Sequence, residues 1–298
     1  MYKIGFVILH YMAYDMTVKC VNNIKQLLSY EQYSIVVIDN GSSNDSGNQL
    51  EIIYRNDEKV KVIRSDQNLG FARGNNLGFS YAKKQMQCDF ICMMNNDVLL
   101  IQDDTCQRMI RSYENTMYAV MGPRIYDSIK NVYPVCAPIQ KIWVYQIHRM
   151  IIKIELLLSC MGVNTEKIIK ITRKILGFDK MNHQNKRENM ADVMQENVIL
   201  HGCCWFFSPQ YIKMYDGIND ETFLYREEEL LYIRVRKNEW QIIYNPQIEV
   251  QHLEKIATKT VNANNKQRRE FIYRNQIKSL KVLIMEMKKL RKGGKLYE

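Results

Sequence analysis

The sequence predicts an α/β protein with a mostly parallel central sheet flanked by helices. Two observations support this fold class. The first hundred residues alternate apolar, strand-like runs with amphipathic, helix-like runs, and polar clusters follow successive strands at their carboxyl ends. With 298 residues, 46% hydrophobic and 25% charged, the chain is long enough to bury a substantial core and is not disordered in composition.

The elements of the first hundred residues follow in order. IGFVILHY is predicted to be a buried strand, and TVKCVNNIKQLLS an amphipathic helix with apolar residues at helical spacing. A second buried strand opens YSIVVIDNGSSNDS, and residues 60–84 predict a strand, a glycine-bearing loop and a helix. DFICMMNNDVLL is predicted to be a fourth strand, interrupted by two amides and a carboxylate.

Three polar clusters fall at the ends of these strands. They are residues 39–42 after the second strand, residues 68–76 after the third, and residues 95–97 in the fourth. Each alone is typical of a turn. Because ligands of such sheets bind beyond the carboxyl ends of the strands, the three together indicate a binding rim. No G-x-G-x-x-G follows the first strand, which disfavours a nicotinamide-binding domain.

The pattern changes over residues 139–187, which are rich in Ile, Lys, Met and Arg and are predicted to be a helical insertion. It is either a hairpin packed on the core or a subdomain that faces an acceptor or a membrane. Beyond it, VILHGCCWFFSPQYI predicts a strand entering a helix. Residues 216–240 predict a turn and an acidic helix, and QIIYNPQIEVQH a strand pair ending at His252.

The net charge of +10 is concentrated at one end of the chain. From residue 266 onward there are eleven lysines and arginines against three glutamates. Residues 266–290 predict a basic amphipathic helix that closes the core, binds anionic lipid, or does both. No nucleic-acid-binding module is recognisable, so nucleic acid is not an expected partner.

The eight cysteines form no C-x-x-C and no zinc spacing, which favours buried free thiols in a reducing cytosol. No run approaches the ~20 apolar residues that span a bilayer, and the N-terminus lacks the features of a signal peptide. The expected protein is therefore cytoplasmic, soluble or peripheral.

Two groups of residues have the chemistry of a catalytic site. The first is Glu227, Glu228 and Glu229, which open the acidic helix and are either a solvated face or a source of a general base. The second is Asp97 and His252, whose oxygen and nitrogen would complete a site for a divalent ion if they meet.

Six motifs in order resemble family 2 glycosyltransferases with the GT-A fold and its Rossmann-like sheet. The match is to the rhamnosyltransferase-like kind found in bacterial surface-polysaccharide pathways, and it runs from about residue 4 to residue 275. The motifs are VVIDNGSSNDS, NLGFARGNNLG, MMNNDVLL, GINDETFLYREEELLYIR, the strand at 246–252 and YRN at 273–275.

The resemblance implies a role for each matching residue. Glu228 would be the catalytic base and Glu227 its neighbour, while Asp97 and His252 would ligate Mg²⁺ or Mn²⁺. Asp39 would contact the nucleotide base or ribose, and Arg73 and Gly74 would lie near the sugar diphosphate. The nucleotide-sugar-binding set is Asp39, Asn40, Gly41, Asn68, Gly70, Arg73, Gly74, Asn95 and Asn96.

The chain departs from the family pattern at several positions. Leu230 stands where a second aspartate is common, a glutamate replaces the usual aspartate base, and neutral Asn95 opens the metal motif. His10 and Met12 stand where the first strand usually ends in asparagines.

The implied activity is inverting transfer of a hexosyl or rhamnosyl unit from a UDP- or dTDP-sugar. The acceptor would be a lipid-linked or other oligosaccharide of capsule, O-antigen or cell-wall synthesis, met at the inner face of the cell membrane.

Competing hypotheses are a nucleotidyltransferase, a non-catalytic nucleic-acid or anionic-surface binding protein, and a catalytically dead relative. The expected organisation is a catalytic domain over 1–265 and a basic tail over 266–298. Within the domain, the nucleotide-sugar part is about 1–125, the helical insertion 139–187 and the acceptor part 195–265.

Overall fold

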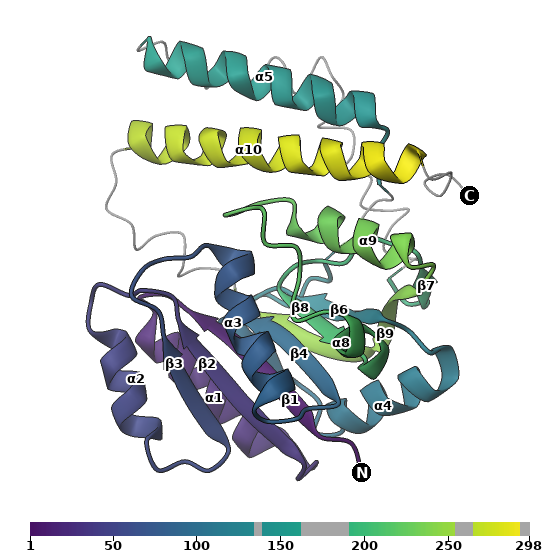
Figure 1. The fold of residues 1–298 in the computed structure, drawn as a ribbon. Helices are drawn as coiled ribbons and strands as arrows, with labels where there is room; N and C mark the ends of the chain where they lie inside the picture. The colour runs from purple at the N-terminus through teal and green to yellow at the C-terminus, as the bar shows by residue number, and fades with distance from the viewer. Residues whose placement is uncertain (134–138, 162–190, 254–264, 293–298) are drawn as a thin grey trace.

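A central sheet with helices on both faces forms the body of the protein (Figure 1). The computed structural model describes residues 1–133, 139–161, 191–253 and 265–292. Within these residues the sheet has nine strands in the order β3-β2-β1-β4-β8-β6-β9-β5, with β7 paired to β9. The predicted α/β class is confirmed.

The first four strands form the parallel half of the sheet. β1, β2 and β4 are almost entirely buried and mostly apolar, as expected for parallel strands covered on both faces, whereas the edge strand β3 is partly exposed. Their carboxyl ends therefore meet at one edge. The strands are β1 (Ile4–His10), β2 (Tyr33–Asp39), β3 (Val60–Arg64) and β4 (Phe90–Asn95).

The other half of the sheet mixes directions. β8 is antiparallel to both β4 and β6, β6 is parallel to β9, and β5 and β7 are antiparallel to β9. These strands are β5 (Val98–Leu100), β6 (Val120–Tyr126), β7 (Gln195–Glu196), β8 (Cys204–Phe207) and β9 (Ile242–His252).

Two strand predictions are wrong in detail. Residues 89–100 form two strands, because the chain turns at Asn96 and Asp97 and β5 leaves β4 to pair with β9. The expected strand pair at 241–252 is one strand, β9, whose pairing with β6 shifts register between Pro123 and Arg124.

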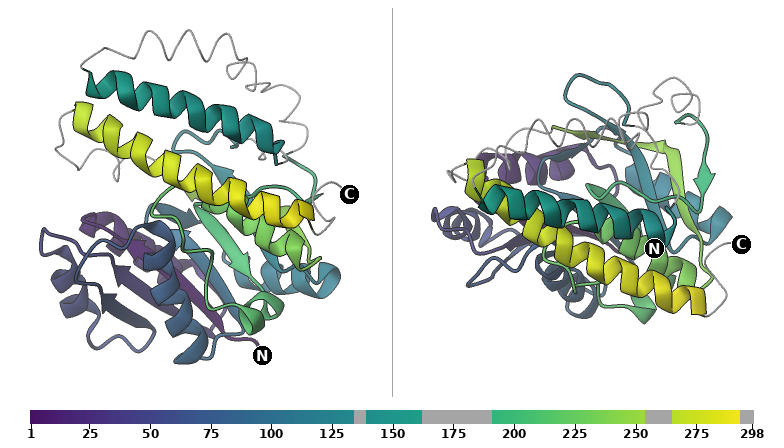
Figure 2. Two further views of the ribbon diagram at one scale, coloured as in Figure 1. Left: turned by 45° about the horizontal axis from the view of Figure 1, so that its top comes forward. Right: turned by 90° about the horizontal axis from the view of Figure 1, so that it is seen from above.

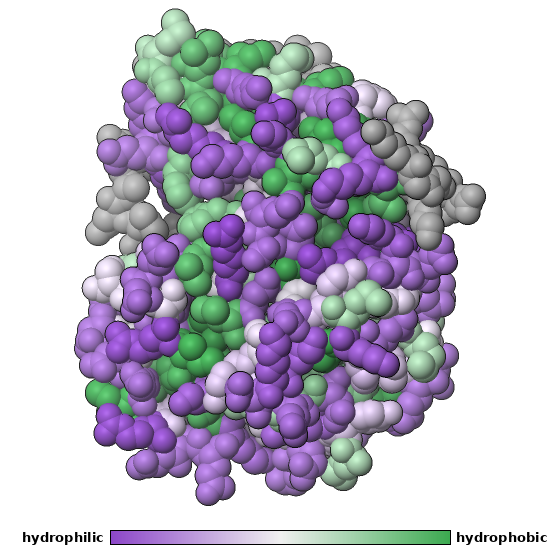
Figure 3. Space-filling model, viewed as in Figure 1, coloured by the Kyte–Doolittle hydropathy of each residue, from purple (hydrophilic) through white to green (hydrophobic). Residues whose placement is uncertain are grey.

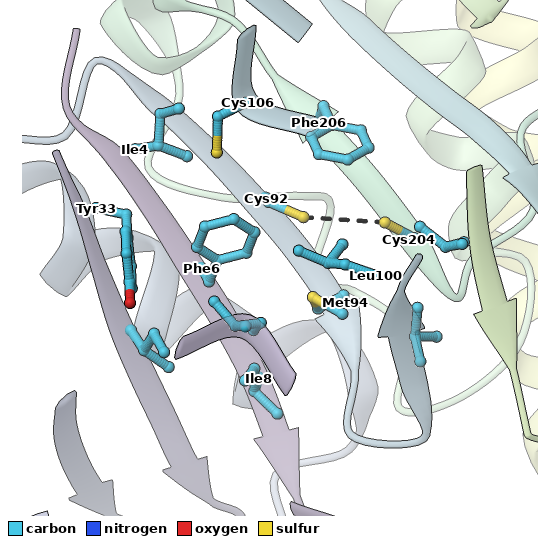
Figure 4. Close-up of a cluster of buried hydrophobic side chains, with 14 of the residues drawn as sticks. Ile4, Phe6, Ile8, Tyr33, Cys92, Met94, Leu100, Cys106, Cys204 and Phe206 are labelled. Carbon is cyan, nitrogen blue, oxygen red and sulfur yellow. Dashed lines mark hydrogen bonds between the residues drawn. The ribbon is translucent and has the colours of Figure 1, made fainter. Parts of the chain in front are cut away.

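Each of these helices buries one stripe of apolar side chains against the sheet. On one face α1, α2 and α4 cover a cluster that includes Phe6, Cys92 and Phe206 (Figure 4). On the other face α3, α8 and α9 cover a cluster centred on Trp205 and Phe207. The helices are α1 (Tyr14–Leu27), α2 (Ser46–Tyr54), α3 (Phe71–Lys84), α4 (Thr105–Thr116), α8 (Pro209–Met214) and α9 (Glu227–Lys237).

A further layer lies above α9, formed by α5 (Ile142–Cys160) and α10 (Asn265–Lys292) side by side (Figure 2). Leu280, Leu283 and Met287 of α10 are fully buried in a cluster shared with α5 and α9. Both predicted helical regions thus contain a helix, and residues 162–187 of the predicted insertion lie outside the described residues. The apolar stripe of α10 contacts protein, which matches the closing-helix interpretation.

The described cysteines are free thiols, as predicted. Six are buried and Cys160 is exposed, while Cys136 lies outside the described residues. In the part of the chain that the structure describes, no helix combines the length and apolar character needed to cross a bilayer.

Candidate active site

The polar strand ends that the sequence singled out lie at one edge of the sheet, because β1, β2 and β4 end together. His10 stands opposite Asp39 in the β1–β2 pairing, and Leu9 stands opposite Asn95 in the β1–β4 pairing. His10, Asp39 and Asn95 therefore lie at the same edge, although 85 positions of sequence separate His10 from Asn95.

Asp39 is nearly inaccessible, with 2% of its surface exposed. Its Oδ1 accepts a hydrogen bond of 3.0 Å from the Ser42 N–H, and its Oδ2 lies 3.7 Å from Arg64 Nε. A Cβ at Gly47 would lie 1.7 Å from Asp39 Oδ2, so only glycine fits beside the carboxylate. The carboxylate is held rigidly at the end of β2.

Asn40 is used inside the protein to shape the loop after β3. Its Oδ1 accepts from the Leu69 N–H at 2.9 Å, and its Nδ2 donates to the Gly70 carbonyl and to Asn68 Oδ1. Gly70 has φ +82°, and a Cβ there would lie 2.3 Å from the Phe223 carbonyl oxygen. Gly41, at φ +74°, is equally close to the backbone of Gln67. Residues 40 and 41, in the loop after β2, and residues 68 and 70, in the loop after β3, thus hold the two loops together beside Asp39.

Arg73 lies apart from the pocket of the glutamates. Its Nε donates to the Asp220 carbonyl at 3.1 Å, and it lines a separate groove of about 540 Å³ together with Asn76 and Arg234. Gly74 packs against the sheet, where a Cβ would lie 2.7 Å from Leu9 Cδ1. The nucleotide-sugar roles of both residues remain predictions.

Asp97 and His252 meet, which the sequence alone could not show. His252 Nε2 lies 3.2 Å from Asp97 Oδ1, and both residues are more than nine-tenths buried. The pairing of β5 with β9 places Val98 opposite His252, and the Leu253 N–H donates to the Asp97 carbonyl. The turn before β5 is further held by Asn96, whose Nδ2 donates to Thr17 Oγ1 at 2.9 Å.

The Asp97–His252 pair fits one side of a divalent-ion site. It offers an imidazole nitrogen and a carboxylate oxygen, and His252 Nδ1 is buried with no hydrogen-bond partner among the described residues. Within the described ranges no group of three His, Cys, Asp or Glu could hold a metal. An ion held here would therefore need further oxygens from a ligand or water.

The three glutamates open onto a pocket of about 330 Å³. Asn95 reaches it from the end of β4, Gly202 from the segment before β8, and Gln276 from α10. The pocket thus joins the rim of the sheet to the start of α9. Its lining residues are Phe71, Asn95, His201, Gly202, Cys203, Trp205, Leu224, Tyr225, Arg226, Glu227, Glu228, Glu229 and Gln276.

The glutamates differ in their partners. Glu228 Oε1 accepts from the Gly202 N–H at 2.8 Å, and burial together with Glu229 raises the pKa of Glu228. Burial raises the pKa of Glu227 to about 7, against a hydrogen bond of 3.2 Å from the Thr222 hydroxyl. Glu229 forms an ion pair of 2.5 Å with Arg226, so we assign it a structural role.

The backbone before the glutamates adopts an uncommon conformation. Tyr225 and Arg226 have φ of 76° and 72°, a left-handed region that non-glycine residues seldom occupy. Consecutive residues of this kind cluster at functional sites, where the surrounding structure holds them. Here the Ser279 hydroxyl of α10 donates to the Leu224 carbonyl at 2.7 Å and supports the turn.

His201 belongs to the site and was missed from the sequence. It lines the pocket, and its ring centroid lies 5.8 Å from that of His252 and 5.1 Å from that of Tyr133. A lone histidine before Gly202 carries little signal. The only indication was its polar side chain beside a glycine within the otherwise apolar run that was predicted to be a strand.

His10 connects the two sides of the rim. It is fully buried, with Nδ1 2.7 Å from Thr17 Oγ1 and Nε2 2.8 Å from Ser46 Oγ. Thr17 also receives the hydrogen bond from Asn96, so His10 links the segment after Asp39 to the turn that carries Asp97. Burial lowers the pKa of His10 to about 4, despite the opposing effect of Asp39, and the ring is therefore neutral near pH 7.

Comparison with solved structures identifies the fold class as that of the GT-A glycosyltransferases. The mannosyltransferase PcManGT of Pyrobaculum calidifontis, in complex with GDP-Man and Mn²⁺, matches with a TM-score of 0.56 and 9% identity over 96% of this chain and 74% of that one. Staphylococcus aureus TarS, residues 1–349, matches with a TM-score of 0.52 and 12% identity over 92% and 70%. GalNAc-T7 with UDP, GalNAc and Mn²⁺ matches at 0.58 and 10% identity over 86% of this chain and 45% of that one.

Sequence comparison gives the family. A family model described as glycosyl transferase family 2 matches residues 6–215, from within β1 to just beyond α8, and this range includes all of the polar strand ends. The chain belongs to glycosyl transferase family 2. A search of curated proteins found no match to it.

Proposed function

We propose that this glycosyltransferase moves a sugar from a nucleoside-diphosphate sugar to an acceptor hydroxyl with inversion at the anomeric carbon. The observation that supports this most is the shared pocket. Asn95, two residues before Asp97, and Glu228 line one cavity, although they are 133 residues apart in the chain. A donor held at the strand ends would therefore present its sugar to a carboxylate.

The reaction needs one base and one leaving group. The Glu228 carboxylate takes the proton of the acceptor hydroxyl, and the acceptor oxygen forms a bond to the anomeric carbon. The bond from that carbon to the diphosphate oxygen breaks, and the nucleoside diphosphate leaves with the electron pair. Attack from the face opposite the leaving group inverts the configuration. The raised pKa of Glu228 suits a residue that must hold this proton.

The proposed cofactor is Mg²⁺ or Mn²⁺ at Asp97 and His252. Such an ion, when bound, stabilises negative charge on a departing diphosphate. The oxygens that this two-residue site lacks would be those of the donor. PcManGT and GalNAc-T7, whose structures contain Mn²⁺, support this assignment by their similarity of fold.

For the donor we propose a UDP- or dTDP-sugar, recognised at the rigid loop around Asp39. Two of the similar structures support this choice of nucleotide, because TarS has been solved with UDP-GlcNAc and GalNAc-T7 with UDP. PcManGT differs from them in holding GDP-Man. The proposed acceptor is a lipid-linked or other oligosaccharide of capsule, O-antigen or cell-wall synthesis. The transferred unit would be hexosyl or rhamnosyl, and the enzyme would act in the cytoplasm at the inner face of the membrane.

Release of nucleoside diphosphate from a panel of UDP-, dTDP- and GDP-sugars tests this function. We expect one donor class to be hydrolysed slowly in Mn²⁺ or Mg²⁺, and the rate to fall to background in excess chelator. If every donor of the panel stays intact with either ion, the proposed function is wrong. Full activity in chelator would instead reject the ion while leaving the transfer reaction in place.

A further inference from the structure

The helix α5 exposes an apolar face that the described residues do not cover. Its buried side, with Ile142, Tyr145 and Ile152, packs in the cluster with α10. Because α5 is apolar around most of its circumference, burial of one side leaves another in solvent. Exposed at helical spacing are Trp143, Met150, Ile154 and Leu157, at 58%, 56%, 51% and 61%. Figure 3 shows apolar residues over α5 with hydrophilic residues between and beside them.

A cationic groove runs along this face, between α5 and α10. It has a volume of about 230 Å³, and Arg149, Lys153 and Lys288 are among its lining residues. Arg149 is oriented by a hydrogen bond of 3.2 Å from its Nε to the Ile277 carbonyl, while Lys153 and Lys288 are exposed. Gln146, Met150 and Ile284 are its other lining residues, so basic and apolar side chains share the groove.

The charge of α10 extends this basic character along the layer. Between residues 266 and 290 the helix carries eight lysines and arginines against two glutamates. Glu286 is paired with Lys289, and Arg274, Lys278 and Lys281 are exposed. Most apolar residues of α10 are buried in the cluster with α5 and α9, while Phe271 and Met285 are exposed. On this face α10 therefore supplies mainly charge and α5 supplies most of the apolar contact.

The apolar stripe of α5 and the cations beside it together distinguish between three kinds of partner for this face. A second copy of the chain on this face would bring the lysines of both grooves together, and like charges would repel. Nucleic acid would match the charge but leave the apolar stripe of α5 in contact with phosphates. An anionic lipid surface matches both features, since acyl chains accept the stripe and lipid phosphates accept the lysines.

We propose that the face formed by α5 and α10 docks on an anionic lipid surface. Trp143, Ile154 and Leu157 enter the interface, and Lys153, Lys288 and Arg149 bind lipid phosphates. This inference does not depend on glycosyl transfer. The sequence predicted that the basic helix over residues 266–290 closes the core, binds anionic lipid or does both. It also left residues 139–187 either packed on the core or facing an acceptor or a membrane. Here α5 supplies the apolar contact, and both helices supply the charge. Gln276 of α10 lines the catalytic pocket, so the proposed docking layer adjoins the site.

Vesicle binding of the full chain tests this proposal. We expect binding to phosphatidylglycerol-containing vesicles that weakens in high salt, and none to pure phosphatidylcholine vesicles. The double variant K153E/K288E should lower the partition coefficient at least about 10-fold, because each surface cation contributes about 1 kcal/mol. I154D/L157D should lower it to a similar degree through lost apolar contact. The matched controls, K61E on β3 and I52D on α2, should bind as the wild type does.

Trp143 reports insertion directly. Brominated lipids in the same vesicles should quench its fluorescence, whereas Trp205 is fully buried and should not respond. The W143F variant should lose the quenching. Wild-type binding that K153E/K288E leaves unchanged would overturn the proposal, as would unquenched Trp143. A concentration-dependent dimer abolished by I154D/L157D would overturn it in favour of a second copy.

Discussion

His252 Nε2 lies 3.2 Å from Asp97 Oδ1, although 154 residues separate the two in the chain. The contact follows from one strand pairing. β5 leaves the parallel half of the sheet immediately after Asp97 and pairs with the end of β9, where His252 stands opposite Val98. The polar break in the apolar run at residues 90–100 is thus the point at which the chain crosses to a new neighbour.

This pair predicts where the ion binds. Asp97→Ala and His252→Ala should each weaken Mn²⁺ binding in the presence of nucleoside diphosphate by at least about 10-fold, because each removes one protein ligand. Electron paramagnetic resonance of free Mn²⁺ measures the loss without turnover. Asp103→Ala, an exposed aspartate six residues further along, is the matched control. Unchanged Mn²⁺ affinity in both site variants would place the ion elsewhere.

Glu227 predicts a pH-dependent stability. Burial raises its pKa from 4.5 to about 7, so the folded state favours the protonated form. The contribution is fully present below pH 4.5 and is lost as the pH rises through 7. Glu227→Gln, which has no proton to lose, should therefore exceed the wild type in free energy of unfolding by about 2–3 kcal/mol at pH 8.

Urea unfolding of Glu227→Gln and the wild type between pH 4 and 8 measures this difference. It should shrink toward zero at pH 4, and the control Glu221→Gln, at an exposed site, should show no such trend. A difference independent of pH would mean that Glu227 titrates normally in the folded protein.

His10 predicts a coupled loss of stability. His10→Leu would leave Thr17 and Ser46 without their buried partner, at a cost of about 1–3 kcal/mol. Since His10 and Thr17 share one network, the double variant with Thr17→Val should cost less than the sum of the two single changes. A double-mutant cycle by urea unfolding should give a coupling above about 0.5 kcal/mol. Strict additivity would show that the network has no joint role.

The sequence predicted the features that depend on local pattern. Alternating strands and helices, the rim at the strand ends and the acidic start of α9 all follow from periodicity and turn residues within short windows. It did not reveal that residues 89–100 form two strands, because the partner of β5 lies about 150 residues further along. Similarly, the position of Arg73 depends on the loop around Asp220, and the place of His201 depends on its distant neighbour His252.

The departures from the family pattern have structural settings here. Leu230, where the resemblance implied a second aspartate, is 2% exposed and packs in the cluster with residues of α5 and α10. His10, where the resemblance implied asparagines at the end of the first strand, bonds through both ring nitrogens to Thr17 and Ser46.

The central claim is that Glu228 is the base of a transfer reaction in the pocket shared with Asn95. Turnover of Glu228→Gln, measured with the donor found active in the panel, tests it most directly. We predict a loss of about 10²- to 10⁴-fold in kcat with unchanged donor affinity, while Glu221→Gln keeps full activity. The unfolding free energy of Glu228→Gln at pH 7 should not fall below that of the wild type, because the pKa of the buried Glu228 carboxyl is raised. Near wild-type turnover by a folded, donor-binding Glu228→Gln would contradict the account.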